Sequence, residues 1–115
     1  MRPRTRVLLE DVRQAAAAIK GFVAGRSLGD YDQDLQLRSA VERQFEIIGE
    51  ALAQLSRSDP AAADRITAVE RIVAFRNILA HAYRAVVDAV VWDIIQDHLP
   101  RLREEAEARL REAGP

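Results

Sequence analysis

The chain of 115 residues contains no cysteine. That absence excludes disulfide scaffolds, zinc sites built from thiolates and thiol nucleophiles, and it fits a reducing compartment. Aromatic residues make up only 5% of the chain, too few for the stacking platform of an RNA-recognition sheet. No apolar run approaches the roughly 18 residues of a transmembrane helix, and the run at residues 7–9 is too short for a signal-peptide core. We therefore expect a cytoplasmic protein without membrane contact.

An excess of one charge is also missing, because 17 basic residues stand against 18 acidic ones and the formal net charge is −1. Bulk charge thus gives no argument for nucleic-acid binding, and any anion site must come from a local concentration of cations. Sixteen of the basic residues are arginine and one is lysine, and the chain contains 20 alanines. Because this composition is typical of a GC-rich genome, the number of arginines is not itself a functional signal.

Glycine and proline are scarce, with five and four residues, and they lie where helices should end. Between them, apolar residues recur at spacings of three and four, which is the pattern of one helical face. Gly25 is placed as a C-cap, Ser27 and Asp30 are candidate N-caps, and Pro60 suits the first position of a short helix after a break at residues 58–60. The longer predicted helices span residues 5–24, 31–57 and 67–83, a segment that begins near residue 88, and residues 99–113.

No segment alternates strictly enough to predict a β-strand. The fold class is therefore all-α, and we expect one domain over residues 1–115, built as an up-and-down bundle of four or five helices. A narrow bundle with 49% hydrophobic residues has apolar surface left for a twofold contact, so we expect a homodimer. The residues expected to face inward are Leu8, Val12, Ala15, Ala16, Ile19, Phe22 and Val23, then Leu37, Val41, Phe45, Ile48, Leu52 and Leu55, then Val69, Ile72, Val73, Leu79 and Ala80, then Val90, Val91, Ile94 and Ile95, and finally Leu102, Ala106 and Leu110.

The most informative segment reads Arg-Asn-Ile-Leu-Ala-His-Ala-Tyr, at residues 76–83. Successive helical residues turn by about 100°, which places Arg76 inside the apolar arc of its helix and Tyr83 almost directly over it. A guanidinium on an apolar face is costly unless it meets a carboxylate, a ligand or another subunit. Asn77 and His81 are four residues apart and share a neighbouring stripe. The segment therefore brings an arginine, an amide, an imidazole and a phenol close together.

These residues alone permit two interpretations. In the structural one, Arg76 clasps Glu46 or Glu50 of the preceding long helix, and His81 satisfies carbonyl groups at a helix C-terminus, where a cation is favoured. In the functional one, His81 titrates near neutrality and moves protons, while the planar fork of Arg76 holds phosphate oxygens.

The pattern of Arg, four residues, His, one residue and Tyr is similar to the signature of HEPN-domain ribonucleases. Further segments resemble the HepT-like subgroup of that family, namely AVERQFEIIGEAL at residues 40–52, FRNILAHAYRAV at residues 75–86, and Trp92 followed by DHLPRL at residues 97–102. These segments occur in the family's order and cover nearly the whole chain. One departure is visible, because the family's Pro-Trp pair before the motif is replaced by Ala-Val at residues 68–69.

The resemblance implies a HEPN-like helical fold and a metal-independent endoribonuclease toxin that acts on RNA as a homodimer, without a cofactor. It implies a minimal nucleotidyltransferase as the cognate antitoxin, which transfers AMP to the motif tyrosine and so silences the toxin. Carried over to this chain, Arg76 and His81 are the catalytic residues, Asn77 supports them, and Tyr83 is the AMP acceptor. AMP on Tyr83 would block the cleft by its bulk and its negative charge.

Arg76 and His81 do not share one face of a straight helix, because five residues turn the helix to positions about 140° apart. Either the helix distorts near Ala80, or Arg76 reaches round the helix, or the site is completed across a dimer. We favour the dimer, in which two motifs line one cleft and supply two histidines and two arginines. One histidine per subunit would otherwise leave no separate acid and base.

Other patterns are weaker signals. Residues 30–34 share the first half of a calcium loop, but Leu35 stands in place of the required Gly and Val41 in place of the bidentate Glu, so helix-start acids are the better interpretation. His98 is expected to cap a helix, and a chain with two histidines and no cysteine is not expected to hold zinc. Trp92 is expected to be an anchor in the core or at an interface.

Two further classes of function stay open. The chain is alternatively a catalytically inactive helical module that docks to a nucleotidyltransferase and presents a substrate or surface to it. The motif is then a docking and modification site. The third possibility is a purely structural dimeric bundle. RNA cleavage by the purified protein in EDTA separates the enzyme from the module.

Overall fold

The structure, a computed structural model, describes residues 1–67, 69–81 and 84–114, with the backbone alone at residues 70, 76–78, 80–81 and 84–86. Seven helices and no strand are found in the described ranges, so the predicted all-α class is confirmed. In chain order the helices are α1 (Pro3–Val23), α2 (Leu28–Gln33), α3 (Leu35–Ser58), α4 (Pro60–Ala63), α5 (Val69–His81), α6 (Arg84–Asp97) and α7 (Leu99–Ala113).

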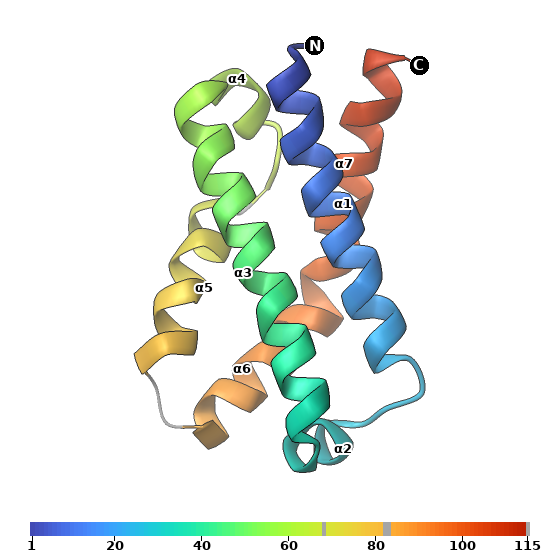
Figure 1. The fold of residues 1–115 in the computed structure, drawn as a ribbon, viewed down its shortest axis with the longest axis vertical. Helices are drawn as coiled ribbons and strands as arrows, with labels where there is room; N and C mark the ends of the chain where they lie inside the picture. Colours follow the sequence, from blue (N-terminus) through green and yellow to red (C-terminus); the bar gives the residue numbers. More distant parts are fainter. Residues whose placement is uncertain (68, 82–83, 115) are drawn as a thin grey trace.

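The long helices form four segments, each running antiparallel to the one before it. Helix α1 descends from the N-terminus, α3 returns beside it, α5 descends along α3, and α6 followed by α7 returns to the starting end (Figure 1). Helix α1 packs against both α3 and α7, and both termini lie at the same end of the molecule (Figure 1). The short helices α2 and α4 lie at the turns before and after α3. This arrangement is the up-and-down bundle of four or five helices that the sequence predicts.

A single apolar core runs along the bundle. Every residue of the predicted stripe between Leu37 and Leu55 is buried, and each large apolar side chain removed from water contributes about 1.5–3 kcal/mol. In α1 one expectation is wrong, because Phe22 is 39% exposed. Leu9 is fully buried instead, which centres the inward face of α1 nearer to Val12 and leaves Phe22 at its edge.

The turn between α1 and α2 follows the predicted capping chemistry. Gly25 has a φ of 73°, the left-handed conformation that favours glycine after a helix end. The hydroxyl group of Ser27 accepts a hydrogen bond from the backbone N–H of Asp30, and the Asp30 carboxylate accepts one from the N–H of Ser27. These two bonds form a capping box at the start of α2.

The helix predicted over residues 31–57 is wrong at its beginning, because it is divided into α2 and α3 at Asp34. The backbone of Asp34 is extended, with φ −114° and ψ 96°, and its carboxylate accepts a hydrogen bond from the N–H of Leu37. A residue that caps a new helix in this way cannot continue the old one. The predicted break before Pro60 is confirmed, with Asp59 as the N-cap of α4.

The two C-terminal helices lie where the sequence predicts them, and α6 begins earlier than predicted. Helix α6 begins at Arg84, four residues before the predicted start near Asp88, and α7 has the predicted bounds. In α7, the expected stripe of Leu102, Ala106 and Leu110 is buried against the rest of the bundle. His98 occupies the N-cap position of α7, as expected, although its side chain makes no capping hydrogen bond.

Candidate functional site

The predicted site residues belong to the C-terminal half of α5 and to the connection that follows it. Arg76, Asn77 and His81 lie on α5, which ends at His81, and the structure describes their backbone. Tyr83, predicted as the AMP acceptor, lies outside the described residues, as does part of the predicted helix over residues 67–83. The motif therefore spans a helix end, where α5 gives way to α6.

Helix α5 is α-helical without interruption through Ala80 to His81. A distortion near Ala80, one of three ways to bring Arg76 and His81 together, is therefore not seen in the backbone. Five residues of regular helix separate positions 76 and 81 by about 140° around the axis. A common site needs either a long reach by Arg76 or a second copy of the chain.

The buried face of α5 is turned from the one expected. Ile72 is buried as predicted, and Phe75, which the sequence analysis did not include, is buried to 2% exposure. Its ring packs edge-on against Phe45 of α3, with the ring centroids 5.2 Å apart. Val69, Val73 and Leu79 are only partly buried. Because Ile72 and Phe75 shift the centre of the face toward Phe75, position 76 lies between Ile72 and the border of the face that the partly buried Val69 and Val73 form.

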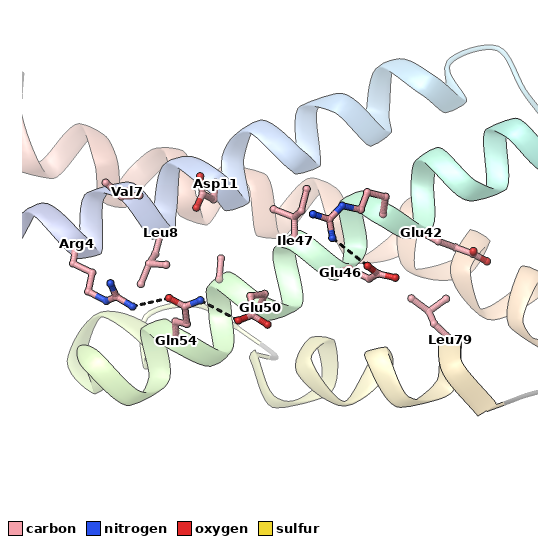
Figure 2. A pocket seen from close by; sticks show the side chains of 12 residues that line it. Arg4, Val7, Leu8, Asp11, Glu42, Glu46, Ile47, Glu50, Gln54 and Leu79 are labelled. Atoms are coloured by element: carbon pink, nitrogen blue, oxygen red, sulfur yellow. Dashed lines mark hydrogen bonds and ion pairs between the residues drawn. The ribbon is translucent and has the colours of Figure 1, made fainter.

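A groove with a volume of about 710 Å³ lies beside this border of α5 (Figure 2). Side chains from α1 and α3 form most of it, and Leu79 comes from α5. Position 76 precedes Leu79 by three residues and is therefore turned only about 60° from it, whereas position 81 is turned about 160° away. The described residues that line the groove are Arg4, Val7, Leu8, Asp11, Glu42, Arg43, Glu46, Ile47, Glu50, Ala51, Gln54 and Leu79.

Carboxylates dominate the polar lining of the groove. Asp11, Glu42, Glu46 and Glu50 face only two cations, Arg4 and Arg43, among the described residues. The guanidinium of Arg43 lies 3.2 Å from the carboxylate of Glu46 (Figure 2). Glu46, which the sequence analysis considered as a partner of Arg76, thus pairs with Arg43 of its own helix. An exposed pair of this kind is worth little in stability, about 0.2–1 kcal/mol.

A row of polar side chains continues along the groove toward the N-terminal end of the bundle. Arg4 donates a hydrogen bond of 2.7 Å to the side-chain oxygen of Gln54, and the amide nitrogen of Gln54 donates one of 3.1 Å to Glu50 (Figure 2). Both glutamates singled out in the sequence, Glu46 and Glu50, therefore line the groove that borders position 76.

Glu42 and Asp11 are half-buried, whereas Glu46 and Glu50 are exposed. Burial, the largest influence, raises the pKa of Glu42 above its ordinary value; nearby Glu46 acts in the same direction, and Arg38 opposes them. Arg38 is itself only 7% exposed, and its guanidinium donates a hydrogen bond to the backbone carbonyl of Asp32. Sequence reasoning missed both residues, although an arginine adjoining the apolar stripe with a glutamate four residues later is a recognisable signal.

Behind Glu42 lies an aromatic contact between α2 and α6. The ring of Tyr31, which is fully buried, lies 5.8 Å from that of Trp92. Burial raises the pKa of the Tyr31 hydroxyl above its ordinary value, and the neighbouring charges of Glu42 and Asp88 add to the effect. Trp92 is thus an anchor at the edge of the core, as predicted.

The described ranges contain no group of three His, Asp or Glu side chains placed to hold a metal ion. The acids at residues 30–34, considered for a calcium loop, include two helix caps, Asp30 and Asp34. The interpretation as helix-start acids is confirmed for these two. None of the helices in the described part of the chain is both long and apolar enough to cross a membrane.

The sequence of the chain matches the family described as Ribonuclease HepT-like over residues 12–109. The chain belongs to the HepT-like ribonuclease family. The matched range includes α3, the whole of α5 and the segment that carries Arg76, His81 and Tyr83. The resemblance that the motif and the flanking segments indicated is therefore confirmed at the level of the family.

Named relatives of the HepT-like chain cover most of its length. It is 30% identical to a protein named "Probable ribonuclease HepT" of Thermococcus cleftensis, over 86% of this chain and 89% of that protein. It is 26% identical to "Putative RNase MJ1380" of Methanocaldococcus jannaschii, over 89% of this chain and 93% of that protein. It is 29% identical to "Putative RNase TTE0752" of Caldanaerobacter subterraneus, over 92% and 94%. No solved structure shows significant similarity to the chain.

Proposed function

We propose that this HepT-like chain is a metal-independent endoribonuclease, the toxin of a toxin–antitoxin pair in the cytoplasm. The observation that carries the proposal is the family match over residues 12–109, within which Arg76, His81 and Tyr83 retain the complete spacing of the HEPN motif. In this proposal a minimal nucleotidyltransferase acts as the antitoxin and transfers AMP to Tyr83.

The proposed chemistry uses the 2′-hydroxyl group of the RNA as the nucleophile. Such a reaction needs a group that moves protons and a cation that stabilises the charge on the phosphorus centre in the transition state. His81 is the proton-transfer group, because its imidazole titrates near neutrality. Arg76 holds the phosphate oxygens with its planar fork, and Asn77 orients His81 or donates to the phosphate.

A homodimer is part of the proposal, because the two catalytic positions are about 140° apart on one regular helix. A twofold contact brings Arg76 of one copy toward the imidazole of the other. The same separation favours a second candidate, a catalytically inactive module that docks to a nucleotidyltransferase. In that case the arginine and the histidine contribute to binding of the nucleotidyltransferase, and they do not need to lie in one common site.

Cleavage of RNA by the purified, unmodified protein in EDTA tests the proposal. We expect His81→Ala and Arg76→Ala each to lower the rate by at least about 100-fold, because a proton-transfer group and a phosphate cation are lost. Two variants serve as matched controls. Arg71→Ala removes an exposed arginine of the same helix, and His98→Ala removes the other histidine. Both are expected to cleave at nearly the rate of the wild type.

The outcomes separate the two candidates. If the unmodified protein cleaves no RNA while circular dichroism shows a folded helical protein, the ribonuclease is excluded and the docking module stands. Equal losses of cleavage rate in the Arg71→Ala and Arg76→Ala variants would contradict a specific role of the motif arginine.

A further inference from the structure

Glu42 forms the end of the acidic groove at which α5 terminates. Figure 2 shows its side chain extending from α3 at the end of the groove where Leu79, the α5 residue that lines the groove, also lies. Leu79 lies two residues before His81, the last residue of α5. The carboxyl group of Glu42 is therefore at the end of the groove nearest the C-terminus of α5, on the side of that helix that position 76 borders and position 81 does not.

The surroundings of Glu42 withdraw its carboxyl group partly from water and place a cation near it. Its side chain is half-buried, and the buried guanidinium of Arg38, one helical turn earlier, attracts it. Arg38 is in turn fixed to the backbone carbonyl of Asp32. By contrast, Glu46 is exposed and paired with Arg43. Of these two neighbours, Glu42 is the carboxyl group that is partly desolvated.

We propose that Glu42 is the general base of the RNA cleavage, a role that rests on the ribonuclease activity proposed above. A general base must be ionised yet basic enough to accept a proton, and partial burial in a groove that reaches solvent provides both. The proton acceptor is then distinct from the general acid, which is His81 of the second copy in the proposed dimer, because position 81 of the same chain is turned away from the groove. This assignment removes the need for one histidine to play both parts.

The chemical step balances without a metal or a redox partner. The carboxylate of Glu42 accepts the proton of the 2′-hydroxyl group as the 2′-oxygen forms its bond to phosphorus. The bond between phosphorus and the 5′-oxygen breaks, and that oxygen takes a proton from the His81 imidazolium. The products are a 2′,3′-cyclic phosphate and a free 5′-hydroxyl group, and both side chains exchange their protons with water before the next cycle.

Several charged or titratable groups surround Glu42 and tune its proton affinity. Arg38 and Glu46 lie on its own helix, and Tyr31 of α2 lies close enough to interact with it electrostatically. Tyr31 also senses Asp88 of α6, so the α6 side of the site carries a further acid. A phosphodiester group among these acids needs cations, and Arg43 lines the same groove. Because Arg38 lowers the pKa of Glu42, substitution of Arg38 is expected to raise that pKa.

Glu42→Gln tests the assignment, with Glu104→Gln as the control. Glu104 is an exposed glutamate of α7 that does not line the groove. Both are measured on a labelled single-stranded RNA of mixed sequence, in EDTA, across a range of pH. For the wild type we expect the rate to fall at low pH, because protonation removes the base, and at high pH, because His81 loses its proton. Glu42→Gln should lower the rate about 100-fold and abolish the low-pH limb of the pH–rate profile. Glu104→Gln should retain both limbs and a rate within about twofold of the wild type.

Three results would overturn the assignment, each in a distinguishable way. If Glu42→Gln cleaves like Glu104→Gln with both limbs intact, Glu42 is not the base, while the ribonuclease activity stands. If the wild type cleaves no RNA, the assignment falls together with the proposed function. If Glu42→Gln does not fold, Glu42→Asp replaces it in the test. That variant keeps a carboxylate and should keep the low-pH limb at a reduced rate, and loss of the limb would contradict the role.

Discussion

Tyr31 is one of only two tyrosines in the chain, and its burial bears on the regulation proposed for the other. Its side chain is fully buried, and its hydroxyl group has no hydrogen-bond partner among the described residues. Burial raises its pKa, so the hydroxyl is both inaccessible and a poor nucleophile. An enzyme that transfers AMP to a tyrosine of the folded chain must therefore use Tyr83.

Tyr83→Phe is expected to abolish adenylylation, with Tyr31→Phe as the matched control. Each variant is co-expressed with the nucleotidyltransferase that is proposed as its antitoxin, and its intact mass is measured. The wild type and Tyr31→Phe should gain the mass of AMP, because the acceptor hydroxyl is retained in both. Tyr83→Phe should keep its unmodified mass. An AMP adduct on Tyr83→Phe, or its loss in Tyr31→Phe alone, would contradict the proposal.

The sequence could not predict the contacts of side chains that have several possible partners. The pattern around residues 76–83 predicted the family correctly, but it did not show that Glu46 lies beside Arg43 of its own helix, because long side chains of similar reach are interchangeable in a sequence. Glu42 was missed for a related reason. The role proposed for it depends on its partial burial beside Arg38, where α2 packs on α3.

At the scale of elements, the docking of α5 on α3 positions the motif, and Phe75 is central to that contact. We expect Phe75→Ala to lower the free energy of unfolding by about 3–5 kcal/mol, because it removes a buried ring and its edge-on contact with Phe45. Phe22→Ala is the matched control. Phe22 is 39% exposed, so its truncation should cost less than about 1 kcal/mol. Urea unfolding followed by circular dichroism measures both, and similar losses in the two variants would contradict the described packing.

The elements themselves were largely predictable, because local capping and apolar spacing decide them. The bounds of α7, the break before Pro60 and the buried stripe of α3 agree with the prediction. The division at Asp34 was not predicted, because an aspartate inside a continuous apolar pattern is compatible with an exposed helical residue or with a cap. Its hydrogen bond to the N–H of Leu37 decides for the cap.

At the scale of the whole molecule, one copy of the bundle does not bring the motif to one side. Position 76 borders the acidic groove that Glu42 and Leu79 line, whereas position 81 is turned about 160° from Leu79 on the same helix. The proposed dimer resolves this separation if the groove of one copy, with its arginine and glutamate, receives the imidazole of the second. The twofold symmetry then creates two equal sites per dimer.

Mixing inactive variants tests this arrangement. Sedimentation of the wild type should give twice the chain mass of 12.9 kDa. When Arg76→Ala and His81→Ala subunits are exchanged at equal amounts, half of the dimers are mixed, and each of these holds one intact site of two. About a quarter of the wild-type activity should therefore return. A mixture of Glu42→Gln and His81→Ala should recover similarly, because those groups also come from different copies.

A mixture of Arg76→Ala and Glu42→Gln should stay inactive, because both groups are needed on the same wall of one groove and no subunit in the mixture carries both. Mixed dimers are verified by tagging one variant and purifying through the tag. If verified mixed dimers of Arg76→Ala and His81→Ala show no activity, each site lies within a single chain. Arg76 must then reach round α5, since the unbroken helix leaves no other route to the imidazole.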